Sequence, residues 1–288
     1  MSWGNWKPDP PCGVDGVPFQ VYLEGPGLSC SGLSELARSA LHFATREHKD
    51  PTNRMRRGSV LHAMVMEPGE VPHRYLFAGA LPSGRKAKDE EIARLEEKAE
   101  REGKELILES EKRLWACARA AREFPAFKAA ADPARSPAIE RSIYWTDEET
   151  GVLLRVRPDS LDLSHEAHAI VTDLKFPEDA SLAAFKREGA RRRNDIRAAM
   201  YVEGVRQVYG VDCLYVFLCI EPVPVKFRGR ARWHYAAYTL NPRTLALGAE
   251  AFRRRLRHYA ACKAADRWPS YNEGLIREVD LPRYAEDL

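Results

Sequence analysis

Apolar positions in the first half of the chain recur at helical spacing, three and four residues apart. One such stretch follows Ser31, at positions 33, 36, 37, 40 and 41, and predicts a helix that this hydroxyl residue begins. A second helix is predicted over residues 57–66 and ends before Pro68, because proline cannot continue a helix. Residues 86–127, rich in Glu, Lys, Arg, Ala and Leu, predict two further helices separated near Gly103.

The middle of the chain changes to short runs of β-forming residues. Residues 140–145 and 152–157 flank a polar turn and predict a β-hairpin. Further strands are predicted at 169–176, 213–220 and 233–240, and further helices at 182–209 and 242–265. Strands interleaved with helices predict an α/β fold in which a mixed central sheet is flanked by helices.

The chain divides into an arm and one domain. Residues 1–27 are rich in proline and glycine, which predicts an N-terminal arm that is irregular or loosely strand-like. No internal repeat or low-complexity linker interrupts residues 28–288, so they are predicted to form a single domain. The charged helices at 86–130 carry no obvious chemistry and are interpreted as an insertion with a structural or lid-like role.

The composition is typical of a globular protein without a membrane segment. Hydrophobic residues make up 44% and charged residues 30% of the 288 positions. No run approaches the roughly 18 apolar residues of a membrane span, and the proline-rich start lacks the pattern of a signal peptide. We therefore expect a cytoplasmic protein with no membrane partner. Six cysteines without CxxC spacing indicate neither a disulfide framework nor a zinc site.

Basic residues are concentrated in two places, although the net charge is only +3. The first is the segment 186–197, which contains Lys186, Arg187, Arg191, Arg192, Arg193 and Arg197 against only two acidic residues. The second comprises four arginines between positions 253 and 257. Each is either a solvated helix face or a surface for nucleic-acid phosphates, and both interpretations stay open.

The candidate chemistry lies at Asp159, Asp173 and Lys175. Asp173 and Lys175 are two residues apart on a predicted strand, so their side chains point to the same face. Asp159 follows the preceding strand, where a bent or antiparallel neighbour would bring its carboxylate alongside. Two carboxylates offer hard oxygen ligands that suit Mg²⁺ or Mn²⁺. With a lysine to stabilise a developing phosphorane or to orient water, the set fits phosphodiester hydrolysis, although each residue is also common in turns and on surfaces.

Two other features favour a nuclease. His62 lies on a predicted helix among small residues, where it is either an ordinary histidine or a borderline metal ligand. Arg197 and Tyr201 are four residues apart on the helix that follows the Asp173 strand, so they share one of its faces.

A series of short motifs also follows one another along the chain. The motifs are Ser29-Cys30-Ser31-Gly32-Leu33, Arg57-Gly58-Ser59-Val60-Leu61-His62, Met66-Glu67-Pro68, Ser142-Ile143-Tyr144-Trp145, Thr150-Gly151, Arg157-Pro158-Asp159, Asp173-Leu174-Lys175 and Ala198-Ala199-Met200-Tyr201. In their order and spacing, from about Leu28 to the C-terminus, they resemble the exonuclease VIII (RecE-type) group of the PD-(D/E)xK nuclease superfamily. More distantly, the chain is similar to lambda exonuclease and RecB-type nuclease domains.

The resemblance implies a restriction-endonuclease-like fold with a catalytic core at 139–265. It implies that Mg²⁺, or Mn²⁺ in its place, is held by His62, Asp159, Asp173 and the Leu174 carbonyl, with Lys175 as the catalytic lysine. It also implies 5′-to-3′ digestion of linear double-stranded DNA from its ends by a homo-oligomer, a ring trimer or tetramer. The products would pass to a single-strand annealing protein in phage-type recombination.

Further residues are candidates for supporting parts in such a site. Glu140, at the start of a predicted strand, offers another carboxylate or forms a surface salt bridge. Ser29, Ser31 and Arg57 are candidates for holding a terminal 5′-phosphate, although Ser31 is equally well placed as a helix cap. The DNA backbone would be held without sequence reading by Arg191, Arg192, Arg193, Arg197 and Tyr201.

The chain departs from the family pattern and leaves rival functions open. Arg197 stands where relatives usually have glutamine, and it lacks a glutamine's paired donor and acceptor; the motif is also DxK where much of the superfamily has ExK. The cysteines at 213, 219 and 262 do not form the group that iron–sulfur nucleases need, so no iron–sulfur cluster is expected. The alternatives are an endonuclease on the same core, a catalytically inactive DNA-binding protein and an enzyme acting on small nucleotides.

Overall fold

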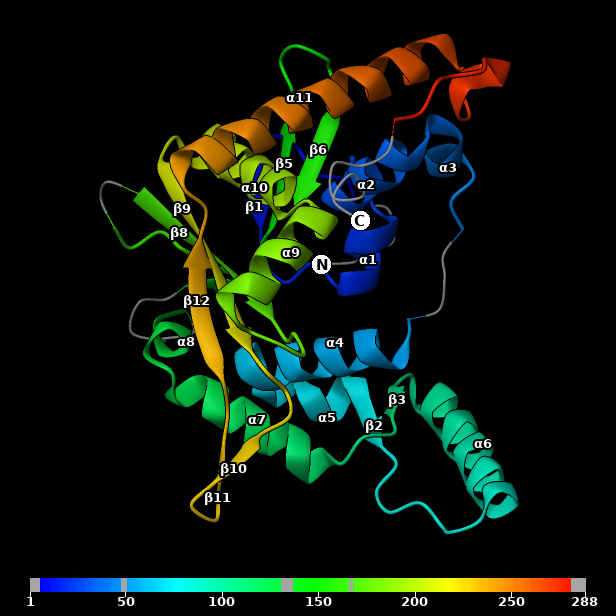
Figure 1. Ribbon diagram of the computed structural model, residues 1–288, viewed down its shortest axis with the longest axis vertical. Coiled ribbons are helices and arrows are strands. Elements are labelled where there is room, and N and C mark those ends of the chain that lie inside the picture. Colours follow the sequence, from blue (N-terminus) through cyan, green and yellow to red (C-terminus); the bar gives the residue numbers. More distant parts are fainter. Residues whose placement is uncertain (1–5, 48–50, 131–136, 166–167, 281–288) are drawn as a thin grey trace.

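A five-stranded mixed sheet forms the centre of the computed structural model, which describes residues 6–47, 51–130, 137–165 and 168–280 (Figure 1). The strand order is β12-β9-β8-β7-β4, with β8 and β9 parallel and all other neighbours antiparallel. The strands are β4 (Ala138–Ile139), β7 (Ser160–Asp162), β8 (His168–Lys175), β9 (Asp212–Ile220) and β12 (Tyr235–Thr239). The predicted α/β fold with a mixed central sheet flanked by helices is confirmed, although β4 and β7 were too short to be predicted.

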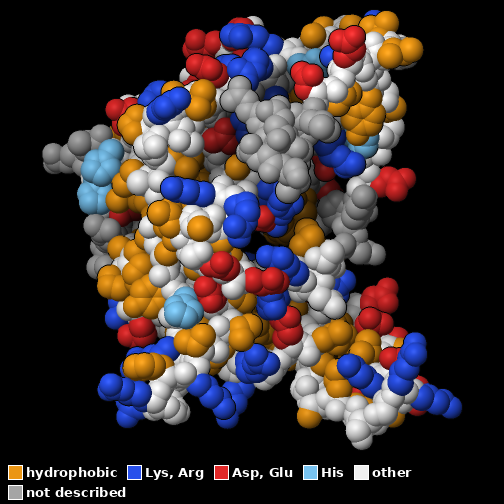
Figure 2. Space-filling view, in the orientation of Figure 1, with side chains coloured by type: hydrophobic (Ala, Val, Ile, Leu, Met, Phe, Trp, Pro, Cys, Tyr) orange, Lys and Arg blue, Asp and Glu red, His pale blue; other side chains and the backbone are white. Residues whose placement is uncertain are grey.

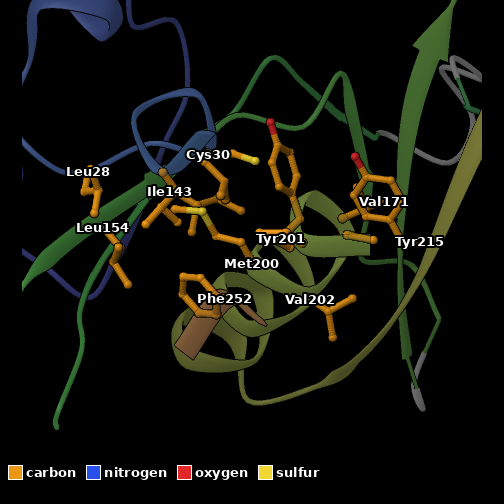
Figure 3. Packing of buried hydrophobic residues seen from close by; sticks show 14 of the residues in the cluster. Leu28, Cys30, Ile143, Leu154, Val171, Met200, Tyr201, Val202, Tyr215 and Phe252 are labelled. Atoms are coloured by element: carbon orange, nitrogen blue, oxygen red, sulfur yellow. The ribbon is translucent and has the colours of Figure 1, made fainter. Parts of the chain in front are cut away.

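The two faces of the central sheet are covered by different helices. Along β8 and β9 the side chains alternate, so Val171 and Phe217 join a core with α10 (Asn194–Tyr209) and α11 (Pro242–Ala265). Leu174 and Leu218 face the opposite way, into a core with α4 (Asn53–Met66) and α7 (Glu111–Glu123). Figure 3 shows the first core, in which Val171 lies with Met200 of α10 and Phe252 of α11. The same alternation puts Asp173 and Lys175 on one face of β8, as the sequence predicted.

A smaller antiparallel sheet extends this core and includes the N-terminal segment. It contains β1 (Cys12–Val14), β5 (Ser142–Thr146) and β6 (Leu153–Val156), so the predicted hairpin is confirmed. The prediction of an irregular or loosely strand-like arm was incomplete, because the arm also forms helix α1 (Phe19–Glu24) and buries Val17 to 1% exposure. Its order comes from packing against Tyr144 rather than from local propensity.

Both ends of the helix predicted after Ser31 differ in the structure. Ser29, not Ser31, caps α2 (Cys30–Arg38), because its hydroxyl accepts the Gly32 N–H at 3.3 Å. The helix stops at Ser39, whose extended backbone and hydroxyl begin a separate short helix, α3 (Ala40–Ala44).

The long helix predicted at 182–209 is two helices, α9 (Leu182–Arg192) and α10. Arg193 lies between them in a left-handed conformation, with φ 54°, and its guanidinium pairs with Asp195 at 2.7 Å. No glycine or proline marks this break, so the helical periodicity alone did not reveal it.

Most of the remaining elements lie around α4 and at the end of the central sheet, whereas the last of them follows α11 at the opposite end of the molecule (Figure 1). They are η1 (Pro68–Glu70), α5 (Val71–Arg74), β2 (Tyr75–Phe77), α6 (Arg85–Glu102), β3 (Glu105–Ile107), α8 (Pro125–Ala130), β10 (Val225–Phe227), β11 (Arg230–Arg232) and η3 (Asn272–Gly274). The predicted interruption near Gly103 is confirmed, since this residue ends α6 with φ 64°. Among the residues that the structure describes, no helix has the length and apolar character needed to cross a membrane.

Candidate active site

The candidate site lies at the carboxyl end of β8, where the chain between β6 and β7 comes alongside. Ser160 pairs with Thr172 in the antiparallel register, which places Asp159 next to Asp173. The Leu174 N–H donates to Asp159 Oδ2 at 2.5 Å and holds this carboxylate at the strand end. The structure therefore brings together the two carboxylates that the sequence singled out; the metal-binding role of the Leu174 carbonyl stays a prediction.

His62 enters this site from α4. Its Nε2 lies 2.9 Å from Asp159 Oδ2, and its Nδ1 lies 3.4 Å from Glu140 Oε1. Burial lowers the pKa of His62, but Asp159, Glu140 and Asp173 outweigh this and raise it to about 9. In the metal-free protein His62 is therefore an imidazolium that neutralises the carboxylates around it.

Glu140 is held in the site by an unusual backbone and by a buried arginine. Its φ of 52° is left-handed, and its N–H donates to the Asp159 carbonyl at 3.2 Å. Arg157 Nε donates to Glu140 Oε2 at 2.6 Å. Burial raises the pKa of Glu140, whereas burial of Asp159 is outweighed by His62 and Lys175, which hold its pKa below the ordinary value. Both roles considered for Glu140, salt bridge and site carboxylate, are thus geometrically available.

The group formed by His62, Glu140 and Asp159 suits a divalent metal ion. One ligand atom from each residue lies within 4.8 Å of the others. An imidazole nitrogen with two carboxylate oxygens is a donor set that Mg²⁺ or Mn²⁺ accepts. The protonated imidazole supplies positive charge between the carboxylates, which is the electrostatic demand that a divalent cation would also meet.

Asp173 lies beside this group rather than within it. Its carboxylate is 5% exposed and forms an ion pair with the Lys175 ammonium, which is 32% exposed. Apart from that ion pair, Asp173 Oδ2 is buried without a hydrogen-bond partner in the described part of the chain. The predicted shared face of Asp173 and Lys175 is observed, and the ion pair holds the buried Asp173 Oδ2 beside the lysine.

Aromatic and basic residues of α10 and β9 form the wall next to Asp173. Arg197 Nη1 donates to Tyr201 Oη at 3.4 Å, and this hydroxyl donates to the Arg157 carbonyl at 3.2 Å. Tyr201 and Tyr215 point their hydroxyl groups in the same direction, out of the apolar cluster (Figure 3). Burial opposes the charge of Arg197, but Tyr201, Cys30 and Asp173 raise its pKa well above the ordinary value. Arg197 is thus a permanent cation at the site.

The other predicted DNA-binding residues are distributed differently. Arg191 and Arg192 are exposed on α9, and both pair with Glu188, as Arg193 does with Asp195. Ser31 is exposed at the start of α2, where its hydroxyl is 2.8 Å from that of Ser29. Arg57 pairs with Glu109 at 3.8 Å on another side of α4 from His62. The structure therefore does not gather these residues around the metal-binding group.

Arg157 is a supporting residue whose role the sequence did not reveal. Its side chain is 9% exposed, and its Nη1 donates to the Val17 carbonyl at 2.7 Å while its Nε holds Glu140. The N-terminal segment is thereby connected to the site through one guanidinium. Its position directly before Pro158 and Asp159 was the only hint of this role in the sequence. The groups that it binds lie more than 15 residues away along the chain, so they could not be predicted.

We predict that Arg157→Met lowers the free energy of unfolding by about 3 kcal/mol, because it leaves the Glu140 carboxylate buried without its guanidinium partner. Urea unfolding of the metal-free protein measures this. The control is Arg74→Met, since Arg74 forms an ion pair with Glu67 at 2.7 Å but is 41% exposed; we expect a loss below about 1 kcal/mol there. Equal losses in both variants would contradict a bracing role for Arg157.

A second prediction concerns pH. Because the pKa of His62 rises from 6.5 to about 9 on folding, its charge stabilises the metal-free protein fully below pH 6.5 and ceases to do so as the pH rises through about 9. The stability difference between the wild type and His62→Gln should therefore shrink by about 3 kcal/mol over that range. Urea unfolding in EDTA at several pH values measures it, with His73→Gln, at an exposed position of α5, as control. A difference independent of pH would contradict the ion pairs of His62.

The chain matches one protein family and has a fold similar to that of a solved structure. Residues 29–276 match the family described as PDDEXK-like domain of unknown function (DUF3799). The crystal structure of a protein described as a putative exonuclease from Eubacterium rectale has a similar fold, with a TM-score of 0.56 at 12% sequence identity. The alignment covers 91% of this chain and 92% of that one. The comparison with curated proteins gives no match.

These findings confirm the predicted restriction-endonuclease-like core at the level of the superfamily, whereas the RecE-type identity stays a prediction. At 12% identity, the structural similarity concerns the fold alone. The family match extends over most of the chain, from the start of α2 to beyond α11. The chain therefore belongs to the family of PDDEXK-like domains of unknown function (DUF3799).

Proposed function

We propose that this protein is a metal-dependent deoxyribonuclease that hydrolyses phosphodiester bonds. The observation that carries the proposal is the placement of His62, Glu140 and Asp159 within 4.8 Å of one another, beside the Asp173–Lys175 ion pair. A metal-binding group with an adjacent lysine at a strand end suits phosphodiester hydrolysis. The fold similarity to a protein described as a putative exonuclease adds support.

Each residue of the site has a part in this mechanism. Mg²⁺, or Mn²⁺ in its place, would be held by His62, Glu140 and Asp159, with Asp173 and the Leu174 carbonyl as further candidate ligands. Such an ion, when bound, acidifies a water molecule and neutralises charge on the scissile phosphate. Lys175 orients the attacking water or donates to a phosphate oxygen as negative charge develops. Arg157 keeps the Glu140 carboxylate in place.

We further propose that basic groups near α2 hold the substrate phosphates. Arg197 has no carboxylate partner in the described residues, and Arg255 of α11 is likewise unpaired near Cys30. The first N–H groups of α2, next to Ser29 and Ser31, add partial positive charge on that side. Since these groups would contact only the phosphates of the DNA backbone, binding would not depend on base sequence.

The similarity to RecE-type exonucleases supports a more specific proposal about the DNA substrate and the cellular process. We propose an exonuclease that digests linear duplex DNA from its ends, in the 5′-to-3′ direction, as a ring-shaped homo-oligomer. Its single-stranded products would pass to a single-strand annealing protein for homologous recombination. An endonuclease on the same core and an inactive DNA-binding protein are the rival proposals.

The test is digestion of linear duplex DNA, labelled at one 5′ or 3′ end, beside a covalently closed circle. Mg²⁺ and Mn²⁺ are each supplied, and EDTA serves as the metal-free control. Loss of linear DNA only, with early release of the 5′ label, would support the proposed exonuclease and its polarity. Cutting of circles would favour the endonuclease. Salt-sensitive DNA binding without cleavage in either metal would replace the proposal with the DNA-binding protein.

A further inference from the structure

The hairpin formed by β10 and β11 extends beyond the central sheet. Its register pairs Val225 with Arg232 and Phe227 with Arg230, and its turn is made by Arg228 and Gly229, both with positive φ. All residues of both strands are exposed. Figure 1 shows the hairpin at the lower end of the molecule, below α7. Such a two-stranded ribbon is marginal on its own, so exposure on this scale favours a role outside the core.

Four cations are carried by this hairpin without neutralising partners. They are Lys226, Arg228, Arg230 and Arg232, and the sequence contains no acidic residue between Glu221 and Glu250. None of the four forms an ion pair with any residue that the structure describes. Arg191 and Arg192 of α9, by contrast, share Glu188. Figure 2 shows Lys and Arg side chains gathered at this end of the molecule.

The hairpin projects from the same end of the sheet as the candidate site. β8 and β9 are parallel, and Lys175 pairs with Cys219 near the ends of both strands. β9 ends at Ile220, and β10 begins at Val225, after a short connection. A long DNA duplex bound at the carboxyl end of β8 would therefore extend past this end of the sheet, where the hairpin projects.

The exposed apolar residues of the hairpin suit a groove better than a flat surface. Phe227 is 57% exposed, and the Arg228 guanidinium lies over its ring, 5.2 Å from the centroid. Val225 is on the same face as Phe227, and both strands are short, spanning about 10 Å each. A two-stranded ribbon of this size fits the major groove of B-form DNA, which is about 12 Å wide.

We propose that the β10–β11 hairpin is a second DNA contact, which binds the phosphate backbone of duplex DNA outside the site of cleavage. This inference rests on the proposed function, because it gives that site its double-stranded substrate. Uncompensated cations are what a polyanion requires, and neutralising phosphates releases counterions. A surface for a second copy of the chain would leave four like charges facing another copy's four, which disfavours that occupant.

The test compares two variants that each lose four exposed cations. The hairpin variant is Lys226→Gln, Arg228→Gln, Arg230→Gln and Arg232→Gln combined; the control is Arg85→Gln, Lys86→Gln, Arg94→Gln and Lys98→Gln on α6. Binding of a 30-base-pair duplex is measured by fluorescence anisotropy in EDTA at several salt concentrations, after circular dichroism shows folding. We expect the hairpin variant to bind at least about tenfold more weakly, with a salt slope reduced by up to about 4. The control variant should keep the slope of the wild type.

The outcomes separate this inference from the proposed function. If the hairpin variant binds with unchanged affinity and slope while the wild type cleaves DNA, the hairpin proposal is wrong and the nuclease proposal stands. If the variant binds weakly but the wild type cleaves nothing, the hairpin contact stands and the nuclease proposal is wrong. If the hairpin variant only changes the oligomeric state, as seen by light scattering, with DNA binding unaltered, the hairpin is a contact between copies and the proposal is overturned. Equal weakening in both variants would show a general charge effect and would also overturn it.

Discussion

Lys175→Met is expected to reduce metal-dependent DNA cleavage by about 10²–10³-fold while divalent metal binding is retained. The Lys175 ammonium pairs with Asp173 and belongs to no metal-binding group, so its loss removes transition-state stabilisation without removing a candidate ligand. Single-turnover cleavage of linear duplex DNA measures the first effect. Mn²⁺ binding, followed by isothermal titration calorimetry, measures the second.

The matched control is Lys186→Met, which removes an exposed lysine of α9. It should leave the single-turnover rate within about twofold of the wild-type rate, because an exposed charge away from the reacting phosphate contributes little to transition-state stabilisation.

Since Lys175→Met leaves Asp173 buried without its cation, folding is checked first by circular dichroism. Lys175→Arg, which keeps the charge, is the second variant if the first is unfolded, and a loss is again expected because the planar guanidinium cannot place an N–H where the compact ammonium lies. Wild-type rates in folded variants of Lys175 would overturn its catalytic role.

Asp159→Asn is expected to weaken both cleavage and metal binding. Asp159 is the carboxylate closest to His62, at 2.9 Å, and it is held ionised by that imidazolium and by Lys175. An amide keeps the shape and can still accept the Leu174 N–H, but it lacks the negative charge that a hard cation requires. We expect Mn²⁺ affinity to fall by about 10-fold or more, and the single-turnover rate by about 10²–10³-fold.

The two variants thus differ in a way that locates the metal. Calorimetric titration of Asp159→Asn with Mn²⁺ should show weak binding, whereas that of Lys175→Met should resemble the wild type. Asp179→Asn, which changes a carboxylate next to α9 that accepts the Ser181 N–H, serves as the control and should bind Mn²⁺ normally. Unchanged Mn²⁺ affinity in Asp159→Asn would mean that the metal-binding group lies elsewhere. Asp173→Asn, titrated in the same way, shows whether the buried Asp173 Oδ2 is a ligand.

The residues at the strand end could be recognised from the sequence because their relation is local. A period of two puts Asp173 and Lys175 on one face of any strand, and a turn of an α-helix puts Arg197 and Tyr201 on one face of any helix. Runs of β-forming residues at 169–176 and 213–220 also predicted the two strands that became β8 and β9. These inferences needed no knowledge of which segments meet in space.

The basic surfaces could not be assigned in the same way. The segment 186–197 appeared as the main candidate for DNA phosphates because six cations stand close together in the sequence. In the folded chain Arg191 and Arg192 share Glu188, and Arg193 pairs with Asp195. The hairpin cations were not predicted as a binding surface because they alternate with apolar residues, yet none of them has a carboxylate partner among the described residues. Whether a charge is free depends on the rotamers and neighbours that the fold supplies.

By itself, the sequence determined the class of fold, the order of its main strands and helices, and the identity of the residues that meet at the end of β8. Hydrophobic periodicity is a local property and therefore survives in any fold that buries those faces. Only the tertiary structure decided that Glu140 joins His62 and Asp159, since that depends on the left-handed backbone at Glu140 and on the buried Arg157. It also decided that the N-terminal segment contacts the site through Arg157, and that the four hairpin cations have no carboxylate partner among the described residues. These features arise from contacts between segments far apart in the chain, whose energies exist only once the core has packed.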